Sequence, residues 1–261
     1  MPALGALFWV FALWMAEQTC EVLTELARPA AHADIVSLSA CAVLATSLVI
    51  FAMVRVHAPD ASLRALLAVR PIAPLHLVLA IAVGAGLSPA MSTLGDAILR
   101  RWPYGDPEAS ESMQRLVASS SRVALVAGAL VIIPVARELF FRGALFGQLQ
   151  RAASPQAAVV ATTALFALFS ATFDLRELPG AVVLGFAFAR LRARTKTVVA
   201  PVFAHLAFWS VDGIPILRGR DPTADFAYPT RWIVGGAVIA VLALAAVGAG
   251  EAQGELPPDH L

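Results

Sequence analysis

Long apolar runs, separated by short polar stretches, recur along the whole chain. A helix needs about 20 mostly apolar residues to cross roughly 30 Å of hydrocarbon, and runs of about this length are typical of membrane spans. The runs lie near residues 3–25, 35–56, 73–94, 123–141, 155–173, 178–191, 197–217 and 232–250. The pattern therefore predicts an all-α polytopic membrane protein, a bundle of about eight transmembrane helices.

The first of these runs differs from the others in its second half. Glu17, Glu21 and Glu25 recur there at helical spacing and give that half a polar stripe. The opening "MPALGALFWVF" lacks a basic n-region, and no clear cleavage site follows it. We therefore expect this run to remain in the protein as an anchor helix.

The chain shows no internal repeat and few stretches that resemble linkers. Those stretches are residues 95–122, 218–230 and 251–261. We predict a single integral membrane domain over residues 1–261, with residues 251–261 as a flexible tail.

Composition agrees with the hydropathy pattern and excludes some kinds of partner. Apolar residues make up 59% of the chain, charged residues 14%, and the mean hydropathy is +0.77. A net charge of +1 provides no field of one sign, so binding to nucleic acid is disfavoured and membrane lipids are the expected surroundings. Cys20 and Cys41 are too few to define a disulfide framework or a zinc site.

Two short loops carry arginines that are little diluted by acids. They are "RVHAPDASLRALLAVRP" at residues 55–71 and "ARLRARTK" at residues 189–196. Both fall on one side in an eight-helix arrangement, so the positive-inside rule places both termini in the cytoplasm. We expect the protein to lie in the inner membrane of a bacterium. The first loop also has the pattern of an interfacial amphipathic helix, with Leu63, Leu66 and Leu67 opposite its arginines.

Charged residues gather at the end of the fourth apolar run. The stretch "VARELFFRGALFGQLQ", residues 135–150, contains Arg137, Glu138 and Arg142. Ionisable groups at membrane depth cost about 2.5 to 3.5 kcal/mol each by insertion scales and usually face a bundle interior. The alternative is that the helix ends near Ala136 and the arginines snorkel to lipid headgroups.

Two more apolar runs contain polar residues in their second halves. Ser170 and Asp174 are four residues apart, which would place them on one face of a helix. His205 stands in the middle of the seventh run, with Trp209 one turn and Asp212 two turns further on. A lone intramembrane histidine more often bridges helices than binds a ligand. Taken together, the three runs predict a common polar cavity containing Glu138, Ser170 and His205.

The order and spacing of these segments resemble the CPBP family of intramembrane metalloproteases, which includes type II CAAX prenyl endopeptidases and bacterial self-immunity proteins. The resemblance covers roughly residues 120–215. Its segments here are "RELFFR", "FALFS", "GAVVLGFAFARLRARTK" and "APVFAHLAFW". The family pattern has E-E-x-x-x-R, then F-x-x-x-H, a glycine-rich helix, a basic turn, and A-P-x-x-A-H-x-x-x-N.

The resemblance also assigns roles to positions, and three of those positions are substituted here. The family's water-activating glutamate corresponds to Arg137, its first histidine to Ser170 and its asparagine to Trp209. The two histidines and the asparagine form a polar cluster that is often drawn as a metal site. The resemblance leaves Glu138, Arg142 and His205 as the candidate catalytic residues.

Two functions are consistent with this pattern. The favoured one is a degenerate family member that binds a membrane-embedded or lipidated peptide, or another membrane protein, without cutting it. The alternative is an active intramembrane endopeptidase with a rearranged site, in which His205 and Asp174 would bind a divalent metal such as zinc. That alternative has few ligands, because a catalytic zinc usually has three protein ligands and a base for its water. A plain transporter has weaker support, since no repeated half is evident.

The spacing of the charges predicts how they pair. Arg142 lies one helical turn beyond Glu138, so an i, i+4 ion pair would neutralise both groups at the membrane edge. Arg137 would then remain unpaired and would seek headgroups, Asp174 or a substrate carboxylate.

Overall fold

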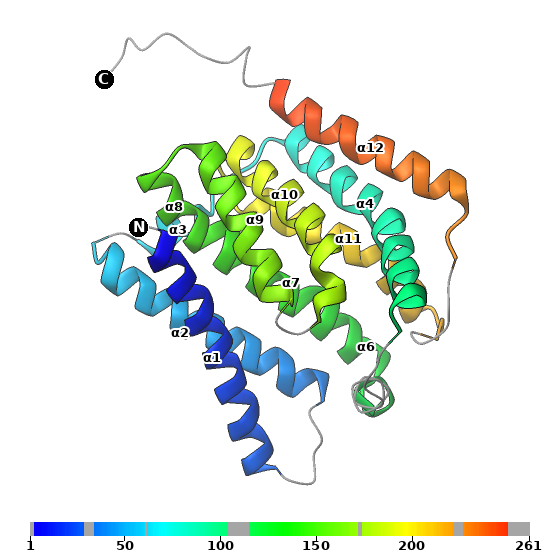
Figure 1. The fold of residues 1–261 in the computed structure, drawn as a ribbon, viewed down its shortest axis with the longest axis horizontal. Helices are drawn as coiled ribbons and strands as arrows, with labels where there is room; N and C mark the ends of the chain where they lie inside the picture. The colour runs from blue at the N-terminus through cyan, green and yellow to red at the C-terminus, as the bar shows by residue number, and fades with distance from the viewer. Residues whose placement is uncertain are drawn as a thin grey trace.

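A computed structural model describes residues 3–28, 34–60, 62–103, 115–171, 174–221 and 227–249, and all regular structure in these ranges is helical. Figure 1 shows the helices packed side by side as one bundle. Eight helices are α1 (Ala3–Ala27), α2 (Ile35–His57), α3 (Leu63–Leu66), α4 (Pro74–Arg101), α9 (Pro155–Ala171), α10 (Leu178–Thr195), α11 (Val199–Leu217) and α12 (Thr230–Ala249).

The fourth apolar run forms a long composite helix from Arg122 to Ala152 in which α-helical and π-helical turns alternate. Its parts are α6 (Arg122–Leu125), η1 (Val126–Ile132), α7 (Ile133–Glu138), η2 (Leu139–Leu145) and α8 (Phe146–Ala152). The alternative prediction that this helix ends near Ala136 is therefore wrong, because the backbone remains helical as far as Ala152. π-helical turns inside α-helices are frequent at functional sites.

The predicted fold class is confirmed, since each of the eight apolar runs contains a helix. Six described helices are long and apolar enough to cross a membrane. Of the other two, α9 is shorter, at 17 residues, and α10 carries three arginines near its end. The predicted linker at residues 95–122 begins too early, because α4 continues to Arg101. The predicted tail, residues 251–261, lies outside the described residues.

Helix starts follow local capping chemistry. The Asp34 side chain accepts a hydrogen bond from the Ser37 amide at 2.7 Å at the start of α2. Ser121 and Ser154 cap α6 and α9 in the same way. Such caps satisfy backbone amides that have no partner within the helix.

The two basic loops lie at the same end of the bundle, as predicted. The Thr197 hydroxyl donates to the Arg70 carbonyl at 2.9 Å, and the Val198 amide donates to the Ala68 carbonyl at 3.1 Å. Leu66 and Leu67 of the amphipathic segment are buried against the bundle. Which side of the membrane this end faces remains a prediction.

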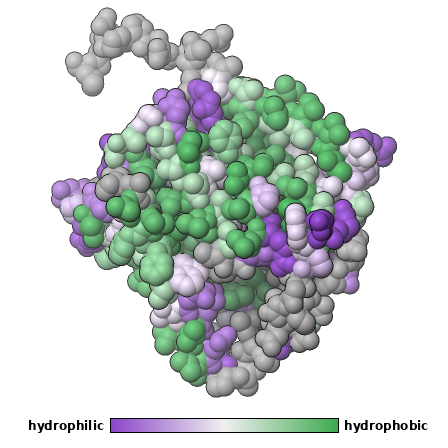
Figure 2. Space-filling view, in the orientation of Figure 1, coloured by the Kyte–Doolittle hydropathy of each residue, from purple (hydrophilic) through white to green (hydrophobic). Residues whose placement is uncertain are grey.

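Large apolar side chains cover the outside of the bundle. Figure 2 shows apolar residues over most of one face. Exposed examples from four helices are Leu4, Val36, Leu75 and Val241. Contiguous apolar surface of this kind is unfavourable in water but is solvated by lipid tails.

Helix α4 packs closely against α11 and α12 (Figure 1). Gly86 and Gly236 let the main chains of α4 and α12 touch: a Cβ atom at Gly236 would lie 2.6 Å from the Gly86 carbonyl oxygen. Small residues at helix interfaces allow this approach, and packing at close range drives helix association in membranes.

We expect Gly236→Ala to destabilise the protein by about 1–3 kcal/mol, because the added methyl forces α4 and α12 apart. The neighbouring Gly235 provides a matched control, since a Cβ there meets nothing within 4 Å. Gly235→Ala should be neutral or slightly stabilising, because alanine favours helix over glycine. Thermal unfolding in detergent measures both variants, and equal midpoints would contradict the close packing.

Candidate active site

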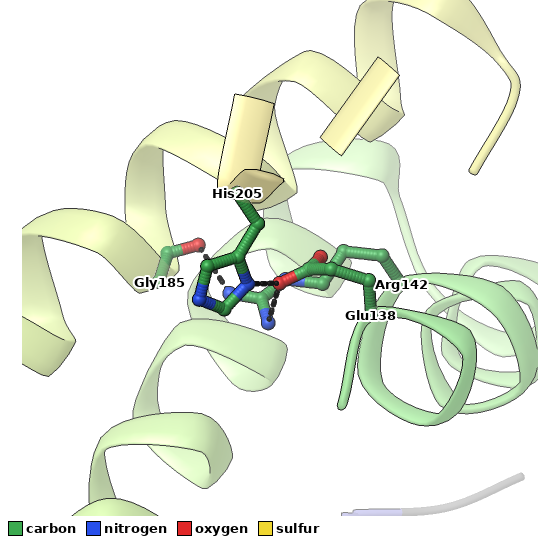
Figure 3. A network of polar contacts seen from close by, with 4 residues as sticks. All are labelled: Glu138, Arg142, Gly185 and His205. Carbon is green, nitrogen blue, oxygen red and sulfur yellow. Dashed lines mark hydrogen bonds and ion pairs between the residues drawn. The ribbon is translucent and has the colours of Figure 1, made fainter. Parts of the chain in front are cut away.

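Three residues from two of the long helices meet inside the bundle. Glu138 ends α7, Arg142 lies in η2 and His205 lies in the middle of α11 (Figure 3). The side chains of Glu138 and Arg142 are fully buried, and His205 is 6% exposed. Polar groups this deep need partners, because burying an unpaired charge is costly.

Glu138 connects the three residues through a single carboxylate oxygen. Its Oε1 accepts a hydrogen bond from Arg142 Nη1 at 3.1 Å, and a second hydrogen bond of 2.8 Å joins it to His205 Nδ1. Arg142 Nη2 donates to the Gly185 carbonyl at 3.3 Å (Figure 3). The predicted i, i+4 ion pair is therefore confirmed, and it also fixes the ring of His205.

Aromatic rings surround the guanidinium of Arg142. Its Cζ lies 4.3 Å from the ring centroid of Phe166 and 5.8 Å from that of Phe141. Such contacts stabilise a desolvated cation through the ring quadrupole. The Arg142 carbonyl accepts from Arg192 Nε at 2.9 Å, a contact that the sequence analysis missed because the two residues are 50 positions apart.

The expectation that Arg137 would be unpaired is wrong. Its Nη2 donates to Glu17 Oε2 at 2.8 Å, its Nη1 bonds the other oxygen of Glu17, and its Cζ lies 4.4 Å from the ring centroid of Phe169. Glu17 is only 2% exposed. The acidic stripe of the first run could have indicated this pair, because a buried glutamate on α1 needs a cationic partner inside the bundle.

Asp174 does not share a helical face with Ser170, because α9 ends at Ala171. Asp174 instead caps the short 3-10 helix η3 (Leu175–Glu177), where its Oδ1 accepts from the amide of Arg176 at 2.9 Å and from its Nε at 2.8 Å. These bonds hold the pKa of Asp174 below its usual range, whereas burial and the nearby Asp174 charge raise the pKa of Glu177.

Asp212, two turns beyond His205, belongs to a different cluster. Its carboxylate accepts from the Tyr228 hydroxyl at 2.7 Å and from the Ser92 hydroxyl at 3.4 Å. Its hydrogen bonds are to Tyr228 and Ser92, whereas His205 bonds to Glu138, so the two residues of α11 belong to different clusters. Burial and the bond to Asp212 raise the pKa of Tyr228.

A cavity of about 670 Å³ lies beside the buried network. Its polar lining includes Arg137, Ser170, His205 and Trp209, and its apolar walls come from α4, α9, α10 and α11. The predicted convergence of the three runs is therefore confirmed for Ser170 and His205. Glu138 does not line the cavity and reaches it only through the ring of His205.

Comparison with known proteins gives a match to one family and a match to one curated protein. Residues 119–211 match the family Type II CAAX prenyl endopeptidase Rce1-like. A Bacillus subtilis protein named "Putative membrane peptidase YdiL" is 32% identical over 104 residues, which cover 40% of this chain and 42% of that protein. Residues 119–211 of this chain are therefore similar to the CPBP family. No solved structure matches the chain.

The matched region makes up less than half of this chain and less than half of the curated relative. It includes Arg137, Ser170, His205 and Trp209, so four residues at positions of the family pattern line the cavity. Glu17 lies outside the matched region, so the partner of Arg137 comes from a helix that the family match does not cover.

The residues at the CPBP positions do not fit a zinc ion. Within the ranges that the structure describes, no three His, Cys, Asp or Glu side chains are grouped closely enough to hold a metal. His205 uses Nδ1 for Glu138, Asp174 is bonded to Arg176, and Arg137 places a cation on the cavity wall. A guanidinium repels a divalent cation and cannot act as a ligand.

Proposed function

We propose that this CPBP-family protein binds a membrane-embedded or lipidated peptide in the cavity and does not cut it. The observation that carries the proposal is that Arg137, which lines the cavity, is paired with the buried Glu17. The resemblance places a water-activating carboxylate at position 137. A guanidinium held by two hydrogen bonds in that place supplies no base.

The remaining carboxylate of the site, that of Glu138, does not line the cavity. Glu138 is fully buried, and its Oε1 is shared by Arg142 and His205. A general base must come within hydrogen-bond reach of the water it activates. Loss of a single catalytic group typically removes orders of magnitude in rate, which favours binding over turnover.

The cavity itself suits a ligand with an apolar body. Its volume falls within the range of about 300–1,000 Å³ that is usual for ligand sites. Phe166, Phe169, Leu184 and Phe208 contribute apolar wall, and a few polar groups interrupt it. A peptide side chain or a lipid group from the membrane would bury apolar surface there without leaving hydrocarbon.

We expect the detergent-purified protein to bind a fluorescent farnesylated peptide and a synthetic transmembrane peptide, and to leave both intact. Anisotropy measures binding, and mass spectrometry after long incubation detects products. Cleavage by the unmodified protein that His205→Ala abolishes would overturn the proposal.

A variant with Arg137→Glu, Ser170→His and Trp209→Asn restores the residue types of the family pattern and is expected to gain cleavage. Glu17→Gln must accompany these changes, because Arg137→Glu alone would set two buried carboxylates against each other. The Glu17→Gln variant alone is the matched control and should remain inactive.

One observation favours the second candidate, an active endopeptidase with a rearranged site. The 2.8 Å bond between Glu138 and His205 Nδ1 is the arrangement by which a carboxylate orients an imidazole as a base. His205 also lines the cavity. Activity that survives chelation of metals and is lost in both Glu138→Gln and His205→Ala would support this candidate.

A further inference from the structure

We propose that the cavity recognises an internal, uncharged stretch of a membrane peptide through its backbone carbonyls, together with a basic side chain near the carboxylates of its wall, and discriminates against a free carboxylate terminus. This inference rests on the proposed peptide binding and specifies which part of a peptide the cavity accepts.

The first step is the charge balance of the two buried ion pairs at and beside the cavity wall. Arg137 is neutralised by Glu17, and Arg142 is neutralised by Glu138. Both acids are at most 2% exposed, so little solvent screens these pairs. A ligand carboxylate would therefore add one uncompensated charge where desolvation is costly, whereas a neutral carbonyl would add none.

The second step is the supply of hydrogen-bond donors. The Trp209 indole N–H can only donate, and among the described residues neither this group nor the Ser170 hydroxyl has a hydrogen-bond partner in the protein. Arg137 has five N–H donors, and Glu17 takes one from each of two nitrogens. These three cavity-lining residues therefore offer hydrogen-bond donors without adding net charge, and carbonyl oxygens are suitable acceptors for them.

This donor supply restricts the conformation of the bound segment. Within a transmembrane helix the backbone carbonyls already accept hydrogen bonds from the same helix. Only a segment that is locally non-helical has carbonyls free for Trp209, Ser170 and Arg137. The cavity thus suits a peptide stretch that is unwound, and it compensates the unwound carbonyls with its own donors.

The third step is the charge of the other ionisable side chains that line the cavity, which take no part in the pairs of Arg137 and Arg142. The cavity lining includes the carboxylates Asp96, Asp174 and Glu177 and one nearby cation, Arg176, which pairs with Asp174. The carboxylates outnumber the cation there. An excess of negative charge repels an anionic end group and attracts a lysine or arginine side chain.

Three fluorescent octapeptides with the same apolar sequence test the inference on the full-length protein in detergent. One has a lysine and a C-terminal amide, the second has the lysine and a free C-terminal carboxylate, and the third has glutamate in place of lysine and a C-terminal amide. We expect the first to bind about tenfold or more tightly than each of the others. Equal or tighter binding of the carboxylate peptide would overturn the inference while leaving peptide binding intact. No binding of any peptide would overturn the proposed function with it.

Two variants separate recognition from folding. Trp209→Phe keeps an aromatic ring but removes the N–H, and is expected to weaken binding of the amide peptide about tenfold. Trp232→Phe, on the exposed face of α12, is the matched control and should change nothing. Unchanged affinity in Trp209→Phe would contradict the role of the indole donor.

Glu17→Gln provides the most selective test, because it leaves the charge of Arg137 uncompensated on the cavity wall. The carboxylate peptide should then gain affinity relative to the amide peptide, so that the selectivity falls or reverses. A selectivity that stays the same in Glu17→Gln would show that the ion pair does not set it.

Discussion

Arg137→Ala is expected to lower the stability of the protein by about 3–5 kcal/mol, the range seen when one partner of a buried ion pair is removed. The variant leaves Glu17 as an unpaired charge that is only 2% exposed, and it also removes the contact with the Phe169 ring. The loss should exceed that of any exposed charge, because surface ion pairs contribute about 0–1 kcal/mol.

The double variant Glu17→Gln with Arg137→Gln is the decisive comparison. Two amides can still hydrogen-bond each other without leaving a charge, so most of the lost stability should return. Unfolding in mixed micelles measures the double variant and the two single variants, Glu17→Gln and Arg137→Gln. Glu25→Ala, an exposed acid on the same helix, is the control and should cost under about 0.5 kcal/mol. A double variant as unstable as the sum of the two single variants would contradict the ion pair.

If this prediction holds, α1 is part of the functional core and not a separate anchor. Glu17 lies on α1, 120 positions from Arg137, and positions the guanidinium that lines the cavity. Removing α1 would leave Arg137 with an unpaired charge at that wall. The first helix would then position a residue that lines the cavity, even though this helix lies outside the part of the chain that matches the family.

The helices were predictable from the sequence because membrane burial acts on every residue of a span. Each apolar run gave a helix, since in hydrocarbon the backbone must satisfy its own hydrogen bonds. The boundary of the fourth run was less predictable. Arg137 and Arg142 suggest an end of the helix, but Glu17, Glu138 and Gly185 pair with them and the helix continues to Ala152.

Of the site's contacts, only the local ones could be derived from spacing. The pair of Glu138 and Arg142 follows from one helical turn, whereas the partners of Arg137 and of the Arg142 carbonyl come from distant helices. The prediction that Ser170 and Asp174 share a helical face was wrong because it assumed that the helix continues to Asp174, whereas α9 ends at Ala171. The local hydrogen bonds from Arg176 give Asp174 a capping role instead.

The second large effect is expected in the buried network itself. Arg142→Leu should cost about 3–5 kcal/mol, because the fully buried Glu138 carboxylate would lose its cationic partner. Glu138→Leu should cost a similar amount, since it leaves the Arg142 guanidinium without its carboxylate. Arg151→Leu, an exposed arginine on the same composite helix, is the control and should have little effect.

A double-mutant cycle then tests whether Glu138 and Arg142 act as a pair. The double variant should be more stable than the sum of the single losses predicts, by about 1 kcal/mol or more, because it leaves neither charge orphaned. Recovery should be incomplete, since Arg142 also bonds the Gly185 carbonyl and stacks on Phe166. Arg142→Lys should be about as unstable as Arg142→Leu, because one ammonium group cannot replace a planar guanidinium that bonds Glu138 and the Gly185 carbonyl together. If the losses of unfolding free energy in detergent are strictly additive, Glu138 and Arg142 do not stabilise each other. The contribution of Glu138 would then come from its hydrogen bond to His205.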